Sequence, residues 1–198
     1  GHFAEASGVS PLGEASRQGT FILGDEIFGQ ATGDWQNVEL AGAKAVEQRY
    51  PTWDTTRDAS IAATVNGHVA AIFGPAGAIH SYSHTAALRQ FIRRVVARVF
   101  TPDVTVEGGP SVEVALRRKE GKTLLHLVNC AGMQVAAEYM SGDFVPPVGP
   151  LKISVRLPAR PSKAVLAPEG AEIAGAWQSG RWTGVINRLE VHQIVQFS

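Results

Sequence analysis

The spacing of apolar residues changes near Pro102, and this change constrains the fold more than any other feature of the sequence. Before Pro102, one stripe of large apolar side chains has helical spacing: Leu88, Phe91, Ile92, Val95, Val96 and Val99. We expect a helix from His84 to Phe100, capped by Ser83 and stopped by Pro102. After Pro102, apolar and polar residues alternate, as they do in half-buried strands.

Alternation is clearest at residues 112–117 and 151–157. Other short apolar runs, separated by turn residues, supply further strand candidates: 123–130, 163–167, 171–177, 181–186 and 189–197. Short strands with turn signals every eight to twelve residues are typical of an antiparallel sandwich. We therefore predict an all-β antiparallel sandwich over residues 106–198.

The first part of the chain has mixed signals, and for residues 1–105 we expect an α/β segment. Asn66-Gly67 lies between two apolar runs and predicts a hairpin, because both turn residues must accept positive φ. Residues 20–29 resemble a short helix, with Thr20 as a cap and Gly29 as a left-handed end. Residues 1–19 show no sustained period and are expected to be irregular.

The amino-acid composition argues against several classes of function. The apolar fraction is 44% and the charged fraction 18%, which favours a packed core over disorder. Eighteen basic residues balance 18 acidic ones, which argues against a nucleic-acid partner and against attraction to a membrane surface. No apolar stretch approaches the ~20 residues of a membrane span, and no signal peptide opens the chain. We expect a bacterial cytoplasmic location.

One cysteine, Cys130, cannot form an internal disulfide or build a zinc site alone. It ends an apolar run and is interpreted as a packed, inert thiol. We expect no metal and no cofactor. The chain begins with Gly1 rather than Met, so we interpret it as an excised fragment.

Several short motifs, in the same order, resemble the C-terminal region of family 42 β-galactosidases and related glycoside hydrolases. Residues 20–29 resemble an F-x-L-x-D-x-F-G element of the amidotransferase-like β-galactosidase trimerisation domain. Residues 124–129, Leu-Leu-His-Leu-Val-Asn, resemble the strand that opens the C-terminal sandwich. Residues 189–195 resemble the last strand of such proteins, although Gln193 stands where relatives often have an acid.

This resemblance implies a partial, flavodoxin-like amidotransferase domain over residues 1–105, followed by the sandwich. In that family the catalytic carboxylates lie on a preceding barrel, so no catalytic residue is carried over to this chain. The implied role is a non-catalytic accessory or oligomerisation region. Its implied partners are the rest of the parent enzyme and further copies in a homo-oligomer.

The residues themselves leave two other functions open. Trp177 and Trp182 flank a predicted turn and could stack on sugar rings as a carbohydrate-binding module, or they could cover the sandwich core. His80 and His84 precede the predicted helix, where they could bind an anion or a metal in a small free-standing enzyme, or simply lie in a loop.

The acidic residues are scattered along the sequence. Asp25 and Glu26 are adjacent, so on a helix their side chains diverge by about 100° and cannot act as a glycosidase pair.

Overall fold

The computed structural model describes residues 2–55, 58–132, 134–135, 140–141 and 144–198. The chain divides into two compact units, Gly1–Thr101 and Pro102–Ser198. Within the described ranges, no helix has the length and apolarity that crossing a membrane requires.

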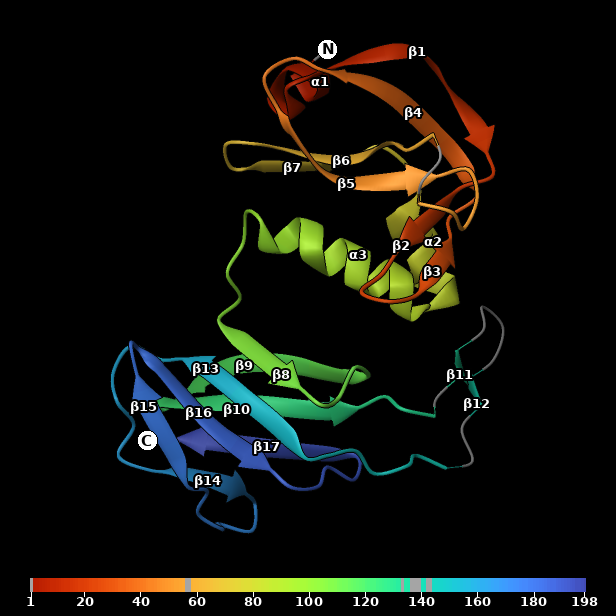
Figure 1. Cartoon of the computed structure of the whole chain (residues 1–198). Helices are drawn as coiled ribbons and strands as arrows, with labels where there is room; N and C mark the ends of the chain where they lie inside the picture. The colour runs from red at the N-terminus through yellow and green to blue at the C-terminus, as the bar shows by residue number, and fades with distance from the viewer. Residues whose placement is uncertain (1, 56–57, 133, 136–139, 142–143) are drawn as a thin grey trace. The chain divides into compact units, whose positions relative to one another are not determined.

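The first unit is built on a five-stranded sheet in the order β3-β2-β5-β6-β7, in which every neighbouring pair is antiparallel. Its strands are β2 (Phe21–Leu23), β3 (Phe28–Gln30), β5 (Lys44–Tyr50), β6 (Ser60–Asn66) and β7 (Val69–Ile72). A two-stranded ribbon of β1 (Val9–Gln18) and β4 (Gly33–Leu40) lies on one side of this sheet, together with the short helix α1 (His2–Ser7) (Figure 1).

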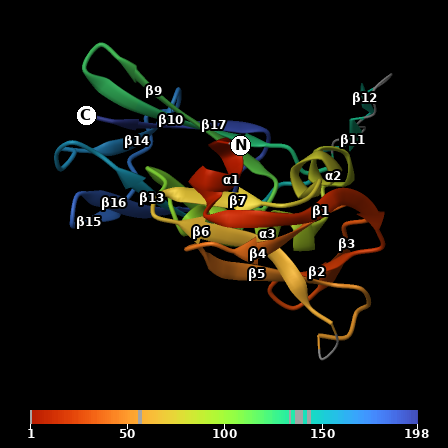
Figure 2. The same cartoon turned by 90° about the horizontal axis from the view of Figure 1, so that it is seen from above.

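The other side of this sheet is covered by α3 (Ala86–Ala97), which follows α2 (Ala76–Ser83) (Figures 1 and 2). Leu88, Phe91 and Val95 of α3 are buried in a core with Ile22 and Trp35. A helix is therefore present here, shorter than the predicted range of 84–100, and Leu88, Phe91 and Val95 of the predicted stripe are buried whereas Val96 is exposed. Its cap is Thr85 rather than Ser83, because Ser83 is the last residue of α2.

The predicted α/β, flavodoxin-like segment over residues 1–105 is wrong. Such a fold needs parallel strands joined by helical crossovers, whereas here the strands between residues 21 and 72 are antiparallel and follow one another without a helix. The helix expected over residues 20–29 is instead β2 and β3, paired from Phe21 to Gln30. Residues 1–19, expected to be irregular, contain α1 and the ten-residue strand β1.

The hairpin of β6 and β7 is confirmed, with its turn one residue later than expected. Asn66 pairs with Val69, so the two loop residues are Gly67 and His68. Gly67 has φ of 57°, the positive value that glycine accepts at the first position of a type II′ turn.

The second unit consists of two four-stranded antiparallel sheets, which confirms the predicted sandwich. One sheet has the order β14-β17-β10-β9 and the other β15-β16-β13-β8. The first contains β14 (Ala164–Ala167), β17 (His192–Phe197), β10 (Lys122–Asn129) and β9 (Val112–Lys119). The second contains β15 (Gly175–Gln178), β16 (Arg181–Ile186), β13 (Leu151–Arg156) and β8 (Val104–Glu107).

The inward-facing residues of both sheets form a single core. Leu125 and Leu127 of β10 meet Ile153 and Val155 of β13 there, all fully buried. The alternation seen in the sequence thus marks the buried face of each strand. The short pair β11 (Gln134–Val135) and β12 (Met140–Ser141) lies in the connection between β10 and β13.

Candidate functional site

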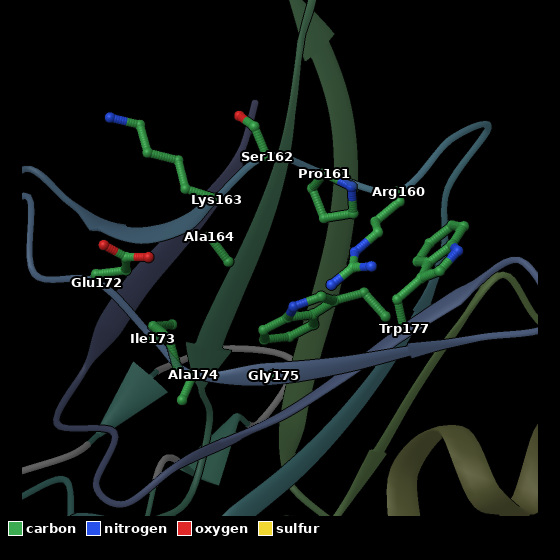
Figure 3. A pocket seen from close by; sticks show the side chains of 11 residues that line it. Arg160, Pro161, Ser162, Lys163, Ala164, Glu172, Ile173, Ala174, Gly175 and Trp177 are labelled. Atoms are coloured by element: carbon green, nitrogen blue, oxygen red, sulfur yellow. The ribbon is translucent and has the colours of Figure 1, made fainter.

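A pocket of about 270 Å³ opens at one edge of the sandwich, next to β15 (Figure 3). Its lining combines an aromatic side chain with charged and hydroxyl groups: Arg160, Ser162, Lys163, Glu172 and Trp177. Figure 3 shows Arg160 and Trp177 on one side of the pocket and Lys163 and Glu172 on the other. The volume suits one small ligand, because pockets for drug-sized ligands begin at about 300 Å³.

The two tryptophans predicted as a sugar platform lie directly opposite each other on β15 and β16. Trp182 is only 4% exposed. Its ring contacts the ring of Phe197 edge to face, with the two ring centroids 5.0 Å apart. A Cβ atom at Gly175 or Gly184 would overlap this ring, so the backbone closes around Trp182. Trp182 is therefore part of the core.

Trp177 differs from Trp182 because it is only half-buried. It packs against the edge of the sandwich core and still contributes to the wall of the pocket. An indole face at a pocket wall offers an apolar surface on which a sugar ring can stack. Both tryptophans line the pocket, and Trp177 is the more exposed of the two.

Two cations give the pocket its charge. The side chains of Arg160 and Lys163 are exposed, and within the described residues neither forms an ion pair. Glu172 is the acidic residue in the lining. Neither cation could be predicted as a site residue, because Arg160 lies in no motif and Lys163 only begins a predicted strand.

The two histidines predicted as an alternative site lie at the end of α2. Their rings contact edge to face, with centroids 5.8 Å apart. His84 is exposed and has left-handed backbone at the helix C-terminus, where its N–H donates to the carbonyl of His80. Burial of the His80 ring, followed by the nearby charges of His84 and Arg89, lowers the pKa of His80. Nδ1 of His80 is buried and has no hydrogen-bond partner.

A cluster of three or more His, Cys, Asp or Glu side chains that could hold a metal is not found among the described residues, so His80 and His84 gain no third ligand there. Neither histidine lines the Trp177 pocket. Helix α2 brings the two histidine rings together. Ligand binding by His80 and His84 remains a prediction.

Cys130 is half-buried at the end of β10. Burial, and then the negative charge of Glu113, raise the pKa of this thiol. A raised pKa reduces the thiolate fraction at neutral pH, which is the reverse of what a nucleophilic cysteine needs.

Two acidic side chains of the first unit are held by one arginine. Arg94 Nε donates to Glu47 Oε1 at 2.8 Å, and Arg94 Nη1 donates to Asp25 Oδ1 at 3.0 Å. Arg94 Nη2 also donates to the carbonyl of Leu23 at 2.6 Å. These contacts join α3 to the sheet, so Asp25 and Glu47 have structural partners.

Comparison with solved structures finds a similar fold, over nearly all of this chain, within two larger enzymes. The α-L-fucosidase isoenzyme 2 from Paenibacillus thiaminolyticus is 13% identical, with a TM-score of 0.79 over 96% of this chain and 33% of that enzyme. Gan42B, a GH42 β-galactosidase from G. stearothermophilus, is also 13% identical, with a TM-score of 0.51 over 98% of this chain and 24% of that enzyme.

The chain thus spans about a third of the fucosidase and a quarter of the β-galactosidase. At this identity the likeness is one of fold: the structural neighbours of this chain are parts of glycoside hydrolases. No family model matches the sequence, and no curated protein matches it.

Proposed function

We propose that this chain is a non-catalytic accessory region of a glycoside hydrolase, and that it packs against the rest of that enzyme and against further copies. The observation that carries the proposal is the match to one third of the α-L-fucosidase, which includes both units of this chain at a TM-score of 0.79. A chain that reproduces a third of a glycosidase is most simply a part of one.

The side-chain chemistry supports a structural role. The carboxylates of Asp25 and Glu47 both contact Arg94, so they serve to join α3 to the sheet of the first unit. The raised pKa of the Cys130 thiol likewise argues against Cys130 as a catalytic nucleophile.

The test uses the complete product of the reading frame that encodes this chain. A version lacking these 198 residues should form a smaller assembly, as measured by light scattering, or unfold at a lower temperature, as measured by calorimetry. The proposal fails if the truncated enzyme has the same mass in solution, the same unfolding temperature and the same turnover as the complete one.

A second function is supported by the Trp177 pocket: binding of a carbohydrate. A sugar ring stacked on Trp177 would place its substituents near Arg160 and Lys163, and unpaired cations favour carboxylate or sulfate groups. An acidic sugar, such as a uronate or a sulfated hexose, therefore fits this pocket better than a neutral one.

Titration of this chain with glucuronate, galactose and sulfated galactose, followed by tryptophan fluorescence, tests that candidate. Saturable binding of the acidic sugars should be lost in Trp177→Ala and weakened in Arg160→Gln. Arg156→Gln is a matched control, because Arg156 is an exposed arginine of the same unit that pairs with Asp103 outside the pocket. Equal signals for galactose and glucuronate, or binding that survives Trp177→Ala, would remove this candidate.

A further inference from the structure

Two histidines from neighbouring strands meet on the outer face of the sandwich. His126 of β10 and His192 of β17 lie on the face opposite the core, because Leu125 and Leu127 on either side of His126 point inward. Nδ1 of His126 is 3.2 Å from Nε2 of His192, and the two rings are stacked with an interplanar angle of 12°.

The strand register fixes this pair. His126 lies opposite Ile194 of β17, and His192 lies opposite Val128 of β10, so the two histidines are diagonal neighbours on one face. On the other side, His126 is opposite Ala115 of β9. The residues directly opposite the two rings are therefore small or apolar, and none of them is a cation that would repel a metal ion.

The separation of the two nitrogens matches that of two ligands on one metal ion. Imidazole nitrogens bind zinc at about 2.0–2.1 Å, so two of them on a tetrahedral ion lie roughly 3.3 Å apart. His192 is exposed and His126 is half-buried, so both nitrogens can be reached from solvent. Because the rings are now stacked, both would have to rotate to aim their lone pairs at one ion.

We propose that His126 and His192 form a binding site for a divalent transition-metal ion on the outer face of the β14-β17-β10-β9 sheet. Neutral imidazoles suit Zn²⁺, Ni²⁺ and Cu²⁺ rather than Mg²⁺ or Ca²⁺, which prefer oxygen ligands. Among the described residues the pair gains no third histidine, cysteine or carboxylate. Water fills the remaining positions, so the ion is exchangeable.

Isothermal titration of the chain with zinc chloride at pH 7.5 tests this site. We expect one saturable ion per chain. His126→Ala and His192→Gln should each weaken binding by tenfold or more. Magnesium chloride should give no saturable signal.

A double variant, His80→Ala with His84→Ala, is the matched control, because it removes the other histidine pair and should bind zinc as the unaltered chain does. His192→Gln retains a side chain that can accept or donate a hydrogen bond toward His126, so the sheet face keeps a polar partner there. Thermal unfolding of each variant without metal shows that it is folded.

The proposal is overturned if the chain takes up no zinc at millimolar concentration, in which case the two rings form only a hydrogen bond. It is equally overturned if His192→Gln binds zinc as tightly as the unaltered chain, which would place the ion elsewhere. Neither outcome bears on the proposed accessory role, which does not depend on this face of the sandwich.

Discussion

Trp182 and Trp177 are cross-strand partners with different surroundings, and their substitution should separate packing from binding. Trp182→Ala empties a closed core position, and such changes cost about 3–5 kcal/mol of unfolding free energy. Trp177→Ala removes a half-buried ring and should cost less. Urea unfolding monitored by circular dichroism measures both. Equal losses for the two variants would contradict the assignment of Trp182 alone to the core.

The ring of His80 should make the first unit less stable in mild acid. Its pKa is lowered in the folded chain, chiefly by burial, so the unfolded chain binds the extra proton more readily. The contribution of His80 is therefore complete above its ordinary pKa of about 6.5 and is lost as the pH falls below that value.

The measurement is the unfolding temperature from pH 7.5 to pH 5 for the unaltered chain and for His80→Gln. We expect a smaller decrease in the variant, because glutamine does not titrate. His68→Gln is the control, since His68 is exposed in the turn between β6 and β7 and is not among the groups that lower the pKa of His80. A decrease that is identical in the unaltered chain and in His80→Gln would exclude this role for His80.

At the level of single residues, the sequence pointed to Trp177 and Trp182, which both line the pocket, but not to the charged residues beside them. Tryptophan is rare and large, so it stands out in any sequence. Arg160 and Lys163 lie in a connecting segment, where basic residues are common and carry no pattern. The His126–His192 pair was missed for a different reason: 66 residues separate the two, and only the strand register brings them together.

At the level of elements, Arg94 fastens α3 to the sheet of the first unit and should matter far more than its neighbour Arg93. Arg94 donates to Glu47, Asp25 and the carbonyl of Leu23, and the Glu47 side chain is only 13% exposed. Hydrogen bonds to charged groups contribute about 1.5–3 kcal/mol, less where solvent screens them.

We expect Arg94→Met to lower the unfolding free energy by about 1–3 kcal/mol in chemical denaturation. Arg93→Met is the matched control. Arg93 approaches Asp25 only at 3.9 Å and its side chain is 75% exposed, so its loss should change stability little. If both variants unfold at the same denaturant concentration, the Arg94 contacts do not stabilise the unit.

Elements with a long, regular pattern could be predicted from the sequence, and short ones could not. The 12-residue helix α3 has four buried residues at helical spacing, and β10 and β13 alternate over six to eight residues. In contrast, β2 and β3 contain three residues each, too few to establish a period. The short helix predicted over residues 20–29 is therefore wrong, and the family resemblance reinforced an α/β interpretation that the antiparallel sheet contradicts.

At the level of the whole molecule, the second unit has a core of its own. Every buried residue of this core belongs to residues 125–197, and the strands that surround it begin at Val104. A truncated chain of residues 102–198 should therefore fold alone, with one cooperative thermal transition and a dispersed proton spectrum. Non-cooperative unfolding of this fragment would show that it depends on the first unit.

One measurement tests directly our proposal that this chain is a non-catalytic part of a glycoside hydrolase. The most direct measurement compares hydrolysis of nitrophenyl β-galactoside and nitrophenyl α-fucoside by the 198-residue chain and by the complete product of its reading frame. We expect turnover by the complete product and none by the chain. Hydrolysis by the chain alone, abolished by substitution of an acidic residue within it, would contradict the account.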